Sequence, residues 1–182
     1  MVSHLGNTSV SGPELRDEIV READFDTGIM SQEQLINAVS EAKKRGEKVV
    51  LTNGCFDLLH AGHVDYLQEA KSEGDRLIVA LNSDESIRRL KEVGRPVTTL
   101  DHRMAIVAGL KAVDWVVPFE EDTPENLISA LQPDVLVKGG DYKNVDQVVG
   151  ADIVKSYGGS VKVLSLVEDC STSAIVQKIR DM

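Results

Sequence analysis

The segment Val49–His63, VVLTNGCFDLLHAGH, decides the fold because a strand, a loop and a helix start follow one another within it. Val49–Thr52 is a short β-branched run that favours a strand. A helical pattern of apolar residues begins at Ala61. Gly54 lies two positions after the run, and its missing side chain lets a phosphate approach the backbone. The segment therefore predicts a strand–loop–helix unit whose loop and helix start can bind an anion.

Further apolar runs alternate with helical patterns along the rest of the chain. The other predicted strands are Leu77–Leu81, Trp115–Val117, Val135–Val137 and Val161–Leu166. The predicted helices are one from Ser31 to Gly46 and then Ala61–Ser72, Glu85–Leu90, His102–Ala112, Pro124–Leu131, Asp146–Tyr157 and Thr172–Arg180. Continuously apolar strands separated by helices indicate a parallel sheet that is covered on both faces. The predicted fold class is α/β, with one doubly wound parallel sheet.

The composition and charge limit the classes of function. Apolar residues make up 42% and charged residues 27% of 182 residues, which excludes a fully disordered chain. The net charge of −10 argues against nucleic acid or an anionic membrane as the partner. No apolar run approaches the roughly 20 residues that span a bilayer, and no secretory signal is visible. The cysteines Cys55 and Cys170 do not make a disulfide scaffold, so we expect a cytoplasmic protein with reduced thiols.

The first 30 residues differ from the remainder. They carry six acidic and two basic residues and few large apolar ones. We interpret residues 1–30 as a linker or tail, with an ordered cap packed on the domain as the alternative. Residues 31–182 then form the folded domain.

Polar and glycine-containing segments follow four of the predicted strands. Ligands of parallel α/β sheets bind at the carboxyl ends of the strands, where the strand order reverses. The segments at these ends are Asn53–His63, Asn82–Asp84, Lys138–Tyr142 and Glu168–Ser173. The sequence therefore predicts one site at this edge of the sheet.

His60 and His63 are the strongest catalytic candidates in these segments. They are three positions apart at a helix start, so both imidazoles can face one point and donate hydrogen bonds to phosphate oxygens. One alternative is that they are ordinary surface or core histidines. Another is a zinc site with Cys55 and Cys170. The cysteines do not form a C-x-x-C pair, so we predict no metal site.

Residues Gly54–His63 resemble the G-x-F-D-x-x-H-x-G-H signature of the cytidylyltransferase-like nucleotidyltransferases. The resemblance implies a Rossmann-like nucleotidyltransferase domain. It also implies that the two histidines bind the nucleotide phosphates and stabilise the α-phosphorus during attack by a substrate phosphate. Ser171 and Thr172 match the S-T pair with which the family holds phosphate, although a plain helix cap is the alternative. The nucleotide-binding residues expected are Asn53, Gly54, Cys55, Phe56, Asp57, Gly62, Gly139, Asp141, Ser171 and Thr172.

The stretch Ser31–Arg180 more closely resembles the adenylyltransferase half of the bifunctional heptose-phosphate kinase/adenylyltransferases of lipopolysaccharide-core synthesis. Matching segments include Arg95–Val97, Phe119–Pro124 and Val137–Tyr142. Leu5–Ser11 resembles the tail of the kinase half, so residues 1–30 read as its end plus a linker, and no kinase activity is expected.

The resemblance implies a reaction in which ATP and D-glycero-β-D-manno-heptose 1-phosphate give ADP-heptose and pyrophosphate. Mg²⁺ is expected to be carried on the triphosphate. The partners expected are ATP and the sugar 1-phosphate, without nucleic acid or membrane, and a homo-oligomer stays open.

Two departures from the cytidylyltransferase branch weaken a CTP interpretation. Lys111–Asp114 stands where those relatives carry R-Y-V-D, and Leu166 stands where they carry an arginine. Lys138 belongs to a Lys-Gly-Gly-Asp segment that borders the nucleotide and sugar-phosphate sites in the heptose branch. A solvated lysine at a strand end is the alternative for Lys138.

Four basic residues lie within eight positions of one another, in the predicted helix Glu85–Leu90 and just after it. This basic cluster comprises Arg88, Arg89, Lys91 and Arg95. It forms either a solvated helix face or a loop that closes on phosphates, and we favour function for Lys91 and Arg95. Arg103, on the next helix, is a weaker candidate. The catalytic residues predicted are therefore His60, His63, Lys91 and Lys138.

Three other functions stay open. A glycerol-3-phosphate cytidylyltransferase is the leading alternative. A non-catalytic nucleotide-binding module has no need for both histidines. A dinucleotide-dependent oxidoreductase is disfavoured because no G-x-G-x-x-G follows the first strand.

Overall fold

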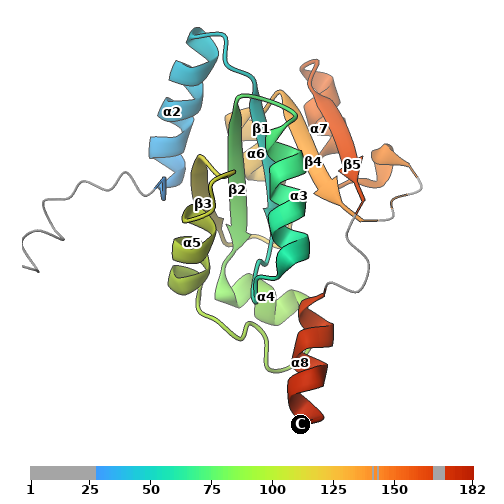
Figure 1. The fold of residues 1–182 in the computed structure, drawn as a ribbon. Coiled ribbons are helices and arrows are strands. Elements are labelled where there is room, and N and C mark those ends of the chain that lie inside the picture. The colour runs from blue at the N-terminus through green and yellow to red at the C-terminus, as the bar shows by residue number, and fades with distance from the viewer. Residues whose placement is uncertain (1–27, 141, 143, 166–170) are drawn as a thin grey trace, which may run out of the picture.

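The protein is built on a five-stranded, wholly parallel sheet (Figure 1). The computed structural model describes residues 28–140, 142, 144–165 and 171–182. The strands are β1 (Val49–Gly54), β2 (Arg76–Asn82), β3 (Trp115–Phe119), β4 (Val135–Gly139) and β5 (Ser160–Leu164). Their order across the sheet is β3-β2-β1-β4-β5, so the winding reverses between β1 and β4. The predicted doubly wound parallel sheet is confirmed.

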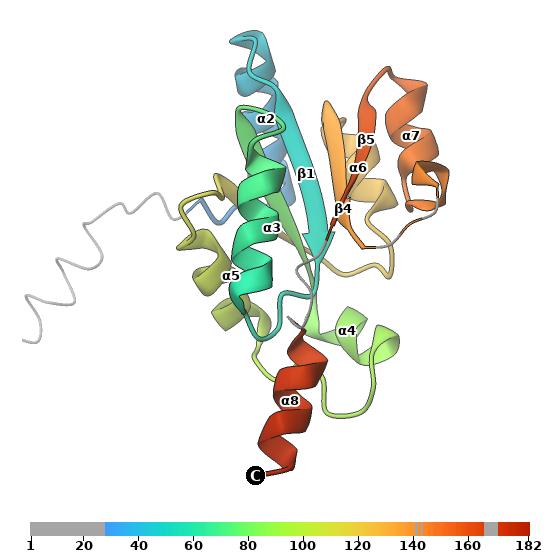
Figure 2. The ribbon, with the colours of Figure 1, turned by 45° about the vertical axis from the view of Figure 1, so that its right-hand side comes forward.

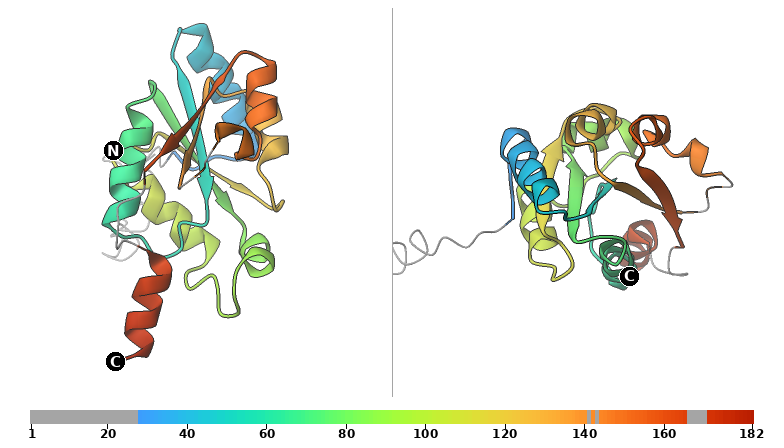
Figure 3. Two further views of the ribbon diagram at one scale, coloured as in Figure 1. Left: turned by 90° about the vertical axis from the view of Figure 1, so that its right-hand side faces the viewer. Right: turned by 90° about the horizontal axis from the view of Figure 1, so that it is seen from above.

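Helices cover both faces of the sheet and its carboxyl edge. They are α2 (Gln32–Lys44), α3 (Ala61–Lys71), α4 (Asp84–Leu90), α5 (Leu100–Ala108), α6 (Glu125–Leu131), the 3₁₀ helix η1 (Val145–Gln147), α7 (Ala151–Ser156) and α8 (Thr172–Arg180). In the view from above, α2, α6 and α7 lie on one face of the sheet, and α3 and α5 lie on the other (Figure 3, right). The helices α4 and α8 lie beyond the carboxyl ends of the strands (Figure 2).

Two apolar layers hold the helices to the sheet because side chains alternate along each strand. In β1, Val49 and Leu51 pack into the layer under α2 and α6, and Val50 packs into the layer under α3. All three side chains are fully buried. This two-sided burial explains why β1 reads as a continuous apolar run instead of an alternating one.

The pairing between β1 and β4 is the shortest in the sheet. These strands share only the pairs Val50–Val135 and Leu51–Leu136. By contrast, β1 and β2 pair over the whole length of β1, from Val49 to Gly54. The carboxyl ends of β1 and β4 are therefore not joined by ladder hydrogen bonds, and this opening is the usual ligand position in doubly wound sheets.

Two predicted helices differ from the structure. The helix expected over His102–Ala112 spans Leu100–Ala108 instead, because Thr99 is its N-cap and Gly109 is its C-cap. The helix expected over Asp146–Tyr157 is divided into η1 and α7. Gly150 separates them with φ of +86°, and a Cβ there would lie 2.4 Å from the Ile128 side chain, so the close approach to α6 requires glycine.

The chain joins the sheet ahead of α2. Ile29 forms a parallel bridge with Val116 in β3, and the Met30 amide donates to the Val116 carbonyl at 2.9 Å. Gly28 has φ of +66° and lies so close to Asp114 that a Cβ would be 2.4 Å from its carbonyl oxygen. Residues 1–27 lie outside the described part of the chain, so the domain boundary at residue 30 stays a prediction.

Over the residues that the structure describes, none of the helices is both long and apolar enough to cross a bilayer.

Candidate active site

The two histidines of the H-x-G-H segment stack on each other at the start of α3. His60 is the N-cap residue of α3, and His63 lies in its first turn. Their ring centroids are 3.9 Å apart with 29° between the planes, and the Phe56 ring lies 5.3 Å from His63. The His60 side chain makes no capping hydrogen bond to α3. Both imidazoles are therefore free of a helix-capping role and lie side by side at a helix N-terminus, where anions are favoured.

Burial keeps both histidines neutral at neutral pH. Desolvation lowers the pKa of His60, and desolvation together with the nearby charge of His60 lowers the pKa of His63 to about 4. Within the described residues, the Nδ1 atoms of both rings are buried without a hydrogen-bond partner. An anion placed here would satisfy donors that the protein leaves unpaired.

We call the segment Gly54–His60, from the last residue of β1 to the N-cap of α3, the phosphate loop, after the ligand that the sequence predicts for it. Phe56 adopts φ of +45°, an uncommon conformation for a bulky residue that is held only where the surroundings enforce it. A Cβ on Gly54 would lie 3.0 Å from the Phe56 ring, so this close packing favours glycine.

Lys138 crosses the opening between β4 and β1. Its Nζ donates to the Asn53 carbonyl at 3.0 Å and to Asn53 Oδ1 at 2.7 Å. Burial, together with the positive charge of Lys91, lowers the pKa of Lys138 to about 8. The Lys138 ammonium is desolvated and has hydrogen bonds but no ion pair, so a nearby anion would stabilise its charge. This position therefore suits a phosphate group.

Asp57 is engaged inside the protein. Its side chain is fully buried and accepts from Arg95 Nε at 2.6 Å and from the Val97 and Thr98 amides at 2.9 Å. These hydrogen bonds outweigh the effect of burial and lower the pKa of Asp57. The Arg95 guanidinium, favoured from sequence as a phosphate clamp, instead pairs with this carboxylate.

The rest of the basic cluster divides between surface pairs and the site. Arg88 pairs with Glu85 at 3.0 Å, and Arg89 pairs with Asp122 at 2.7 Å, all of them exposed side chains. Lys91 is the C-cap of α4 and lines the same cavity as His63. The solvated-face interpretation therefore fits Arg88 and Arg89, and Lys91 faces the site.

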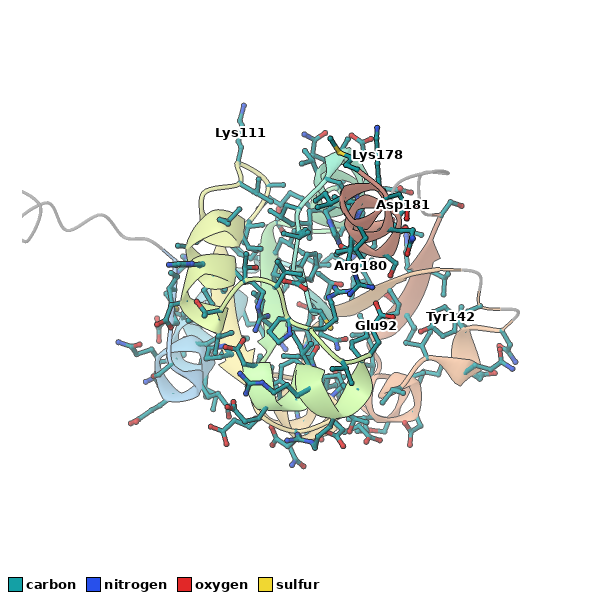
Figure 4. All side chains as sticks on the ribbon, turned by 90° about the horizontal axis from the view of Figure 1, so that it is seen from below. Glu92, Lys111, Tyr142, Lys178, Arg180 and Asp181 are labelled. Carbon is teal, nitrogen blue, oxygen red and sulfur yellow. The ribbon has the colours of Figure 1, made fainter. Side chains whose placement is uncertain are left out.

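Helix α8 begins beside the phosphate loop. Ser171 caps it by accepting from the Ala174 amide at 3.1 Å, and Thr172 Oγ1 donates to the Leu58 carbonyl at 3.1 Å. Capping thus holds the expected S-T pair next to the loop without excluding phosphate binding. Figure 4 looks onto this edge, with Lys178, Arg180 and Asp181 marking α8 and Glu92 marking the loop after α4. Asp141, Leu166 and Cys170 lie outside the described residues.

Two cavities share the wall formed by Cys55, Phe56 and His63. The larger, about 450 Å³, has a lining completed by Asp57, Leu90, Lys91, Glu92, Arg95, Ser171, Thr172 and Ser173. The smaller, about 170 Å³, has a lining completed by Asn53, Gly54, Tyr66, Lys138 and Gly139. Of the predicted site residues that the structure describes, only His60 and Gly62 line neither cavity. His60 stacks on His63, and Gly62 is buried in α3.

Arg103 connects several segments of the site by hydrogen bonds, a role that the sequence analysis did not predict. Its fully buried guanidinium donates to the carbonyl oxygens of Cys55 at 2.7 Å, Asn82 at 2.9 Å and Thr98 at 3.2 Å, and it pairs with Asp84 at 2.7 Å. One side chain thus joins the phosphate loop, the end of β2 and the start of α4. The available signal was a single arginine on an apolar helix.

A cavity of about 580 Å³ lies at the opposite, amino edge of the sheet. Three of its four charged side chains have partners: the Lys43 ammonium donates to the Gln132 carbonyl, Asp134 accepts from the Val49 amide at 2.8 Å, and Glu47 pairs with Arg45 and Arg76. We therefore assign the site to the carboxyl edge despite this cavity's greater volume. Within the described residues, no three His, Cys, Asp or Glu side chains gather as a metal site, and Cys170 of the zinc alternative lies outside them.

Comparisons with known proteins agree with this geometry. The cytidylyltransferase-like family model matches residues 51–178. The chain is 60% identical over 181 residues to bifunctional protein HldE of Ectopseudomonas mendocina and 61% identical over 180 residues to that of Pseudomonas putida. These matches include 99–100% of this chain, and they correspond to 38% of the length of each relative.

Two solved structures share the fold. The lipopolysaccharide core biosynthesis protein from Thermoplasma volcanium is 29% identical with a TM-score of 0.56, covering 67% of this chain and 98% of that one. Pantoate-beta-alanine ligase from Francisella tularensis is 16% identical with a TM-score of 0.54, covering 85% and 78%. The second likeness supports the fold alone.

Proposed function

The chain belongs to the cytidylyltransferase-like family, and on that premise we propose that it transfers the adenylyl group of ATP to a sugar 1-phosphate. The sugar substrate that we propose is D-glycero-β-D-manno-heptose 1-phosphate, which gives ADP-heptose and pyrophosphate for lipopolysaccharide-core synthesis. The identity of about 60% over the whole chain to HldE supports this substrate.

The observation that carries the proposal is the stacked His60–His63 pair beside Lys138 and Lys91 at the opening between β1 and β4. In the proposed reaction, an oxygen of the sugar phosphate attacks the α-phosphorus of ATP in line. The bond from the α-phosphorus to the bridging oxygen breaks, and pyrophosphate leaves with its electron pair. No protein nucleophile is needed, because catalysis consists of positioning and of stabilising negative charge.

The two histidines and the two lysines have distinct roles in this proposal. His60 and His63 donate hydrogen bonds to the phosphoryl oxygens on which charge increases. Lys138 holds the phosphate chain from the β4 side, and Lys91 neutralises it from the loop after α4. Mg²⁺ carried on the triphosphate would neutralise part of its charge and would keep mostly water ligands.

The proposal extends to the organisation of the chain. We infer that residues 31–182 form the nucleotidyltransferase domain and that residues 1–30 are the linker from a sugar-kinase half. The span of 38% of each HldE relative supports this reading. Because ATP is a substrate, we place the reaction in the cytoplasm.

Pyrophosphate release from ATP and from CTP, each with a panel of sugar 1-phosphates and glycerol 3-phosphate, tests the function. We expect turnover with ATP and heptose 1-phosphate. Turnover with CTP and glycerol 3-phosphate would replace the proposal with the cytidylyltransferase alternative. Binding of ATP without turnover of any acceptor would favour the nucleotide-binding module.

A further inference from the structure

The loop between α4 and α5 is one wall of the larger cavity. It begins at Lys91, the C-cap of α4, and ends at Thr99, the N-cap of α5. Its tip is exposed, since 97% of the Val93 surface is accessible. The tip therefore has little packing of its own. The Lys91 amide donates to the Ile87 carbonyl at 2.9 Å, so α4 holds the backbone of Lys91, and the chain beyond it depends on how the rest of the loop is held.

A single carboxylate anchors the second half of this loop. The Asp57 carboxylate accepts hydrogen bonds from Arg95 Nε at 2.6 Å, from the Val97 and Thr98 amides at 2.9 Å and from Thr98 Oγ1 at 3.0 Å. Thr98 Oγ1 also lies 2.8 Å from the Asp57 carbonyl oxygen. Asp57 thus fastens the loop after α4 to the phosphate loop, in addition to Arg103, which donates to the carbonyl oxygens of Thr98 and Cys55.

The Arg95–Asp57 pair is enclosed by the protein. The Arg95 side chain is 8% exposed and the Asp57 side chain is fully buried. In such surroundings the carboxylate neutralises most of the guanidinium charge that a triphosphate would feel. Arg95 is therefore better suited to fixing the loop than to binding phosphate itself.

Lys91 and Lys138 approach the site from opposite sides. Lys91 follows α4 and lines the larger cavity, whereas Lys138 ends β4 and lines the smaller one. The charge of Lys91 acts on the pKa of Lys138, so the two ammonium groups are within electrostatic range. Two lysines that repel each other need a support that holds them together until the anion arrives.

We propose that Arg95 is a positioning residue, whose buried ion pair with Asp57 holds Lys91 towards the substrate phosphates. This inference rests on the proposed adenylyl transfer and adds a residue to it. Arg95 acts through Lys91, and the loop after α4 is fixed before substrate binds. The reaction gains because the Lys91 ammonium needs no reorganisation in the transition state.

A double-mutant cycle tests the action through Lys91. We expect Arg95→Met and Lys91→Ala each to lower kcat, by about 10- to 100-fold. The double variant should be no slower than Lys91→Ala within a factor of about two, because the support has no further role once Lys91 is gone. Arg95→Lys should recover part of the kcat that Arg95→Met loses, because it keeps the charge. The recovery should be incomplete, because lysine lacks the guanidinium geometry. Arg88→Met, which removes an exposed arginine paired with Glu85, is the matched control and should retain kcat.

Hydrogen exchange in the absence of substrate provides a second readout. The Val97 and Thr98 amides donate to Asp57, so Arg95→Met should accelerate their exchange, whereas Arg88→Met should not. If Arg95→Met does not fold, Arg95→Gln, which removes the charge and keeps a hydrogen-bond donor beside Asp57, replaces it in both measurements.

The outcomes separate the two proposals. Additive losses in the cycle, wild-type kcat in Arg95→Met, or unchanged exchange at Val97 and Thr98 would each overturn the positioning role. A wild-type protein that turns over no acceptor, together with faster exchange in Arg95→Met, would overturn the proposed function and retain the anchoring of the loop.

Discussion

The two edges of the sheet treat charge in opposite ways. At the amino edge, Glu47 pairs with Arg76 at 2.7 Å and with Arg45 at 3.0 Å, and these arginines lower the pKa of Glu47 to about 2. Asp114 pairs with Lys71 and Arg76. At the carboxyl edge, burial instead lowers the pKa of the bases His63 and Lys138. The acidic side chains at the amino edge are thus paired with basic ones, whereas the buried bases at the carboxyl edge would be stabilised by an anionic ligand.

This difference explains why cavity size alone misplaces the site. The amino-edge cavity of about 580 Å³ exceeds the carboxyl-edge cavity of about 450 Å³. Desolvated bases are costly to keep in a folded protein, and such cost is typical of functional sites. The following experiments disturb one edge or the other, and they should give responses of very different size.

The largest response is expected from the histidine pair. His63→Ala should lower kcat about 10²- to 10³-fold, the typical effect of losing one transition-state donor. The KM for ATP should change much less, because the lost interaction strengthens in the transition state. Steady-state kinetics of His60→Ala and His63→Ala check this.

Thermal unfolding and metal content serve as controls for the histidine variants. Both variants should fold, since neither ring belongs to the two apolar layers. A folded His63→Ala with wild-type kcat would remove the pair from the mechanism. Loss of a stoichiometric metal with unfolding would return the site to the zinc alternative.

Lys138→Met should lower kcat by about 100-fold and yet stabilise the free protein at pH 7. Folding lowers the pKa of Lys138 from 10.5 to about 8, so charging the amine opposes folding. This cost is fully present below pH 8 and disappears above pH 10.5. The gain in Tm over wild type should therefore be about 2–6 °C at pH 7 and shrink towards pH 10. A Tm gain that does not change with pH would contradict this origin.

Acidification should weaken the free protein through His63. The pKa of His63 falls from 6.5 to about 4 on folding, so the unfolded chain binds the proton first. Stability should decline as the pH drops from 6.5 to 4. His63→Ala should show a shallower decline of Tm in this window than wild type. Parallel Tm curves for the two proteins would show that His63 does not titrate in this way.

The smallest response is expected at the amino edge. Glu47→Gln should lower Tm by only about 1–3 °C, because its ion pairs are solvent-accessible. The stabilisation by Glu47 is present above pH 4.5 and is lost as the pH falls towards 2. The kcat should equal that of wild type. A loss of activity comparable to that of Lys138→Met would erase the distinction between the two edges.

The sequence predicts the order of strands and helices because most of the strand residues are buried on both faces of the sheet. The continuous runs at β1, β2 and β4 leave no competing amphipathic pattern. The break at Gly150 is different, because it depends on contact with Ile128 in α6. Contacts between distant segments are not encoded in local periodicity.

The site divides along the same line. The histidines and the S-T pair follow from local spacing, because each pair lies within one turn of a helix. The roles of Arg95 and Arg103 do not, because their partners Asp57 and Cys55 lie 38 and 48 positions away. An arginine that supports a loop and an arginine that binds phosphate have the same signature in sequence.

The short pairing of β1 with β4 has a mechanical consequence. With ladder pairs only at Val50–Val135 and Leu51–Leu136, this seam is the most compliant line across the sheet. The unit of β4, β5 and α7 can therefore pivot slightly against the unit of β1, β2 and β3. A triphosphate bound by Lys138 on one side and by the phosphate loop on the other would connect β4 to β1 where ladder pairs are missing. Substrate binding would then stiffen the whole domain.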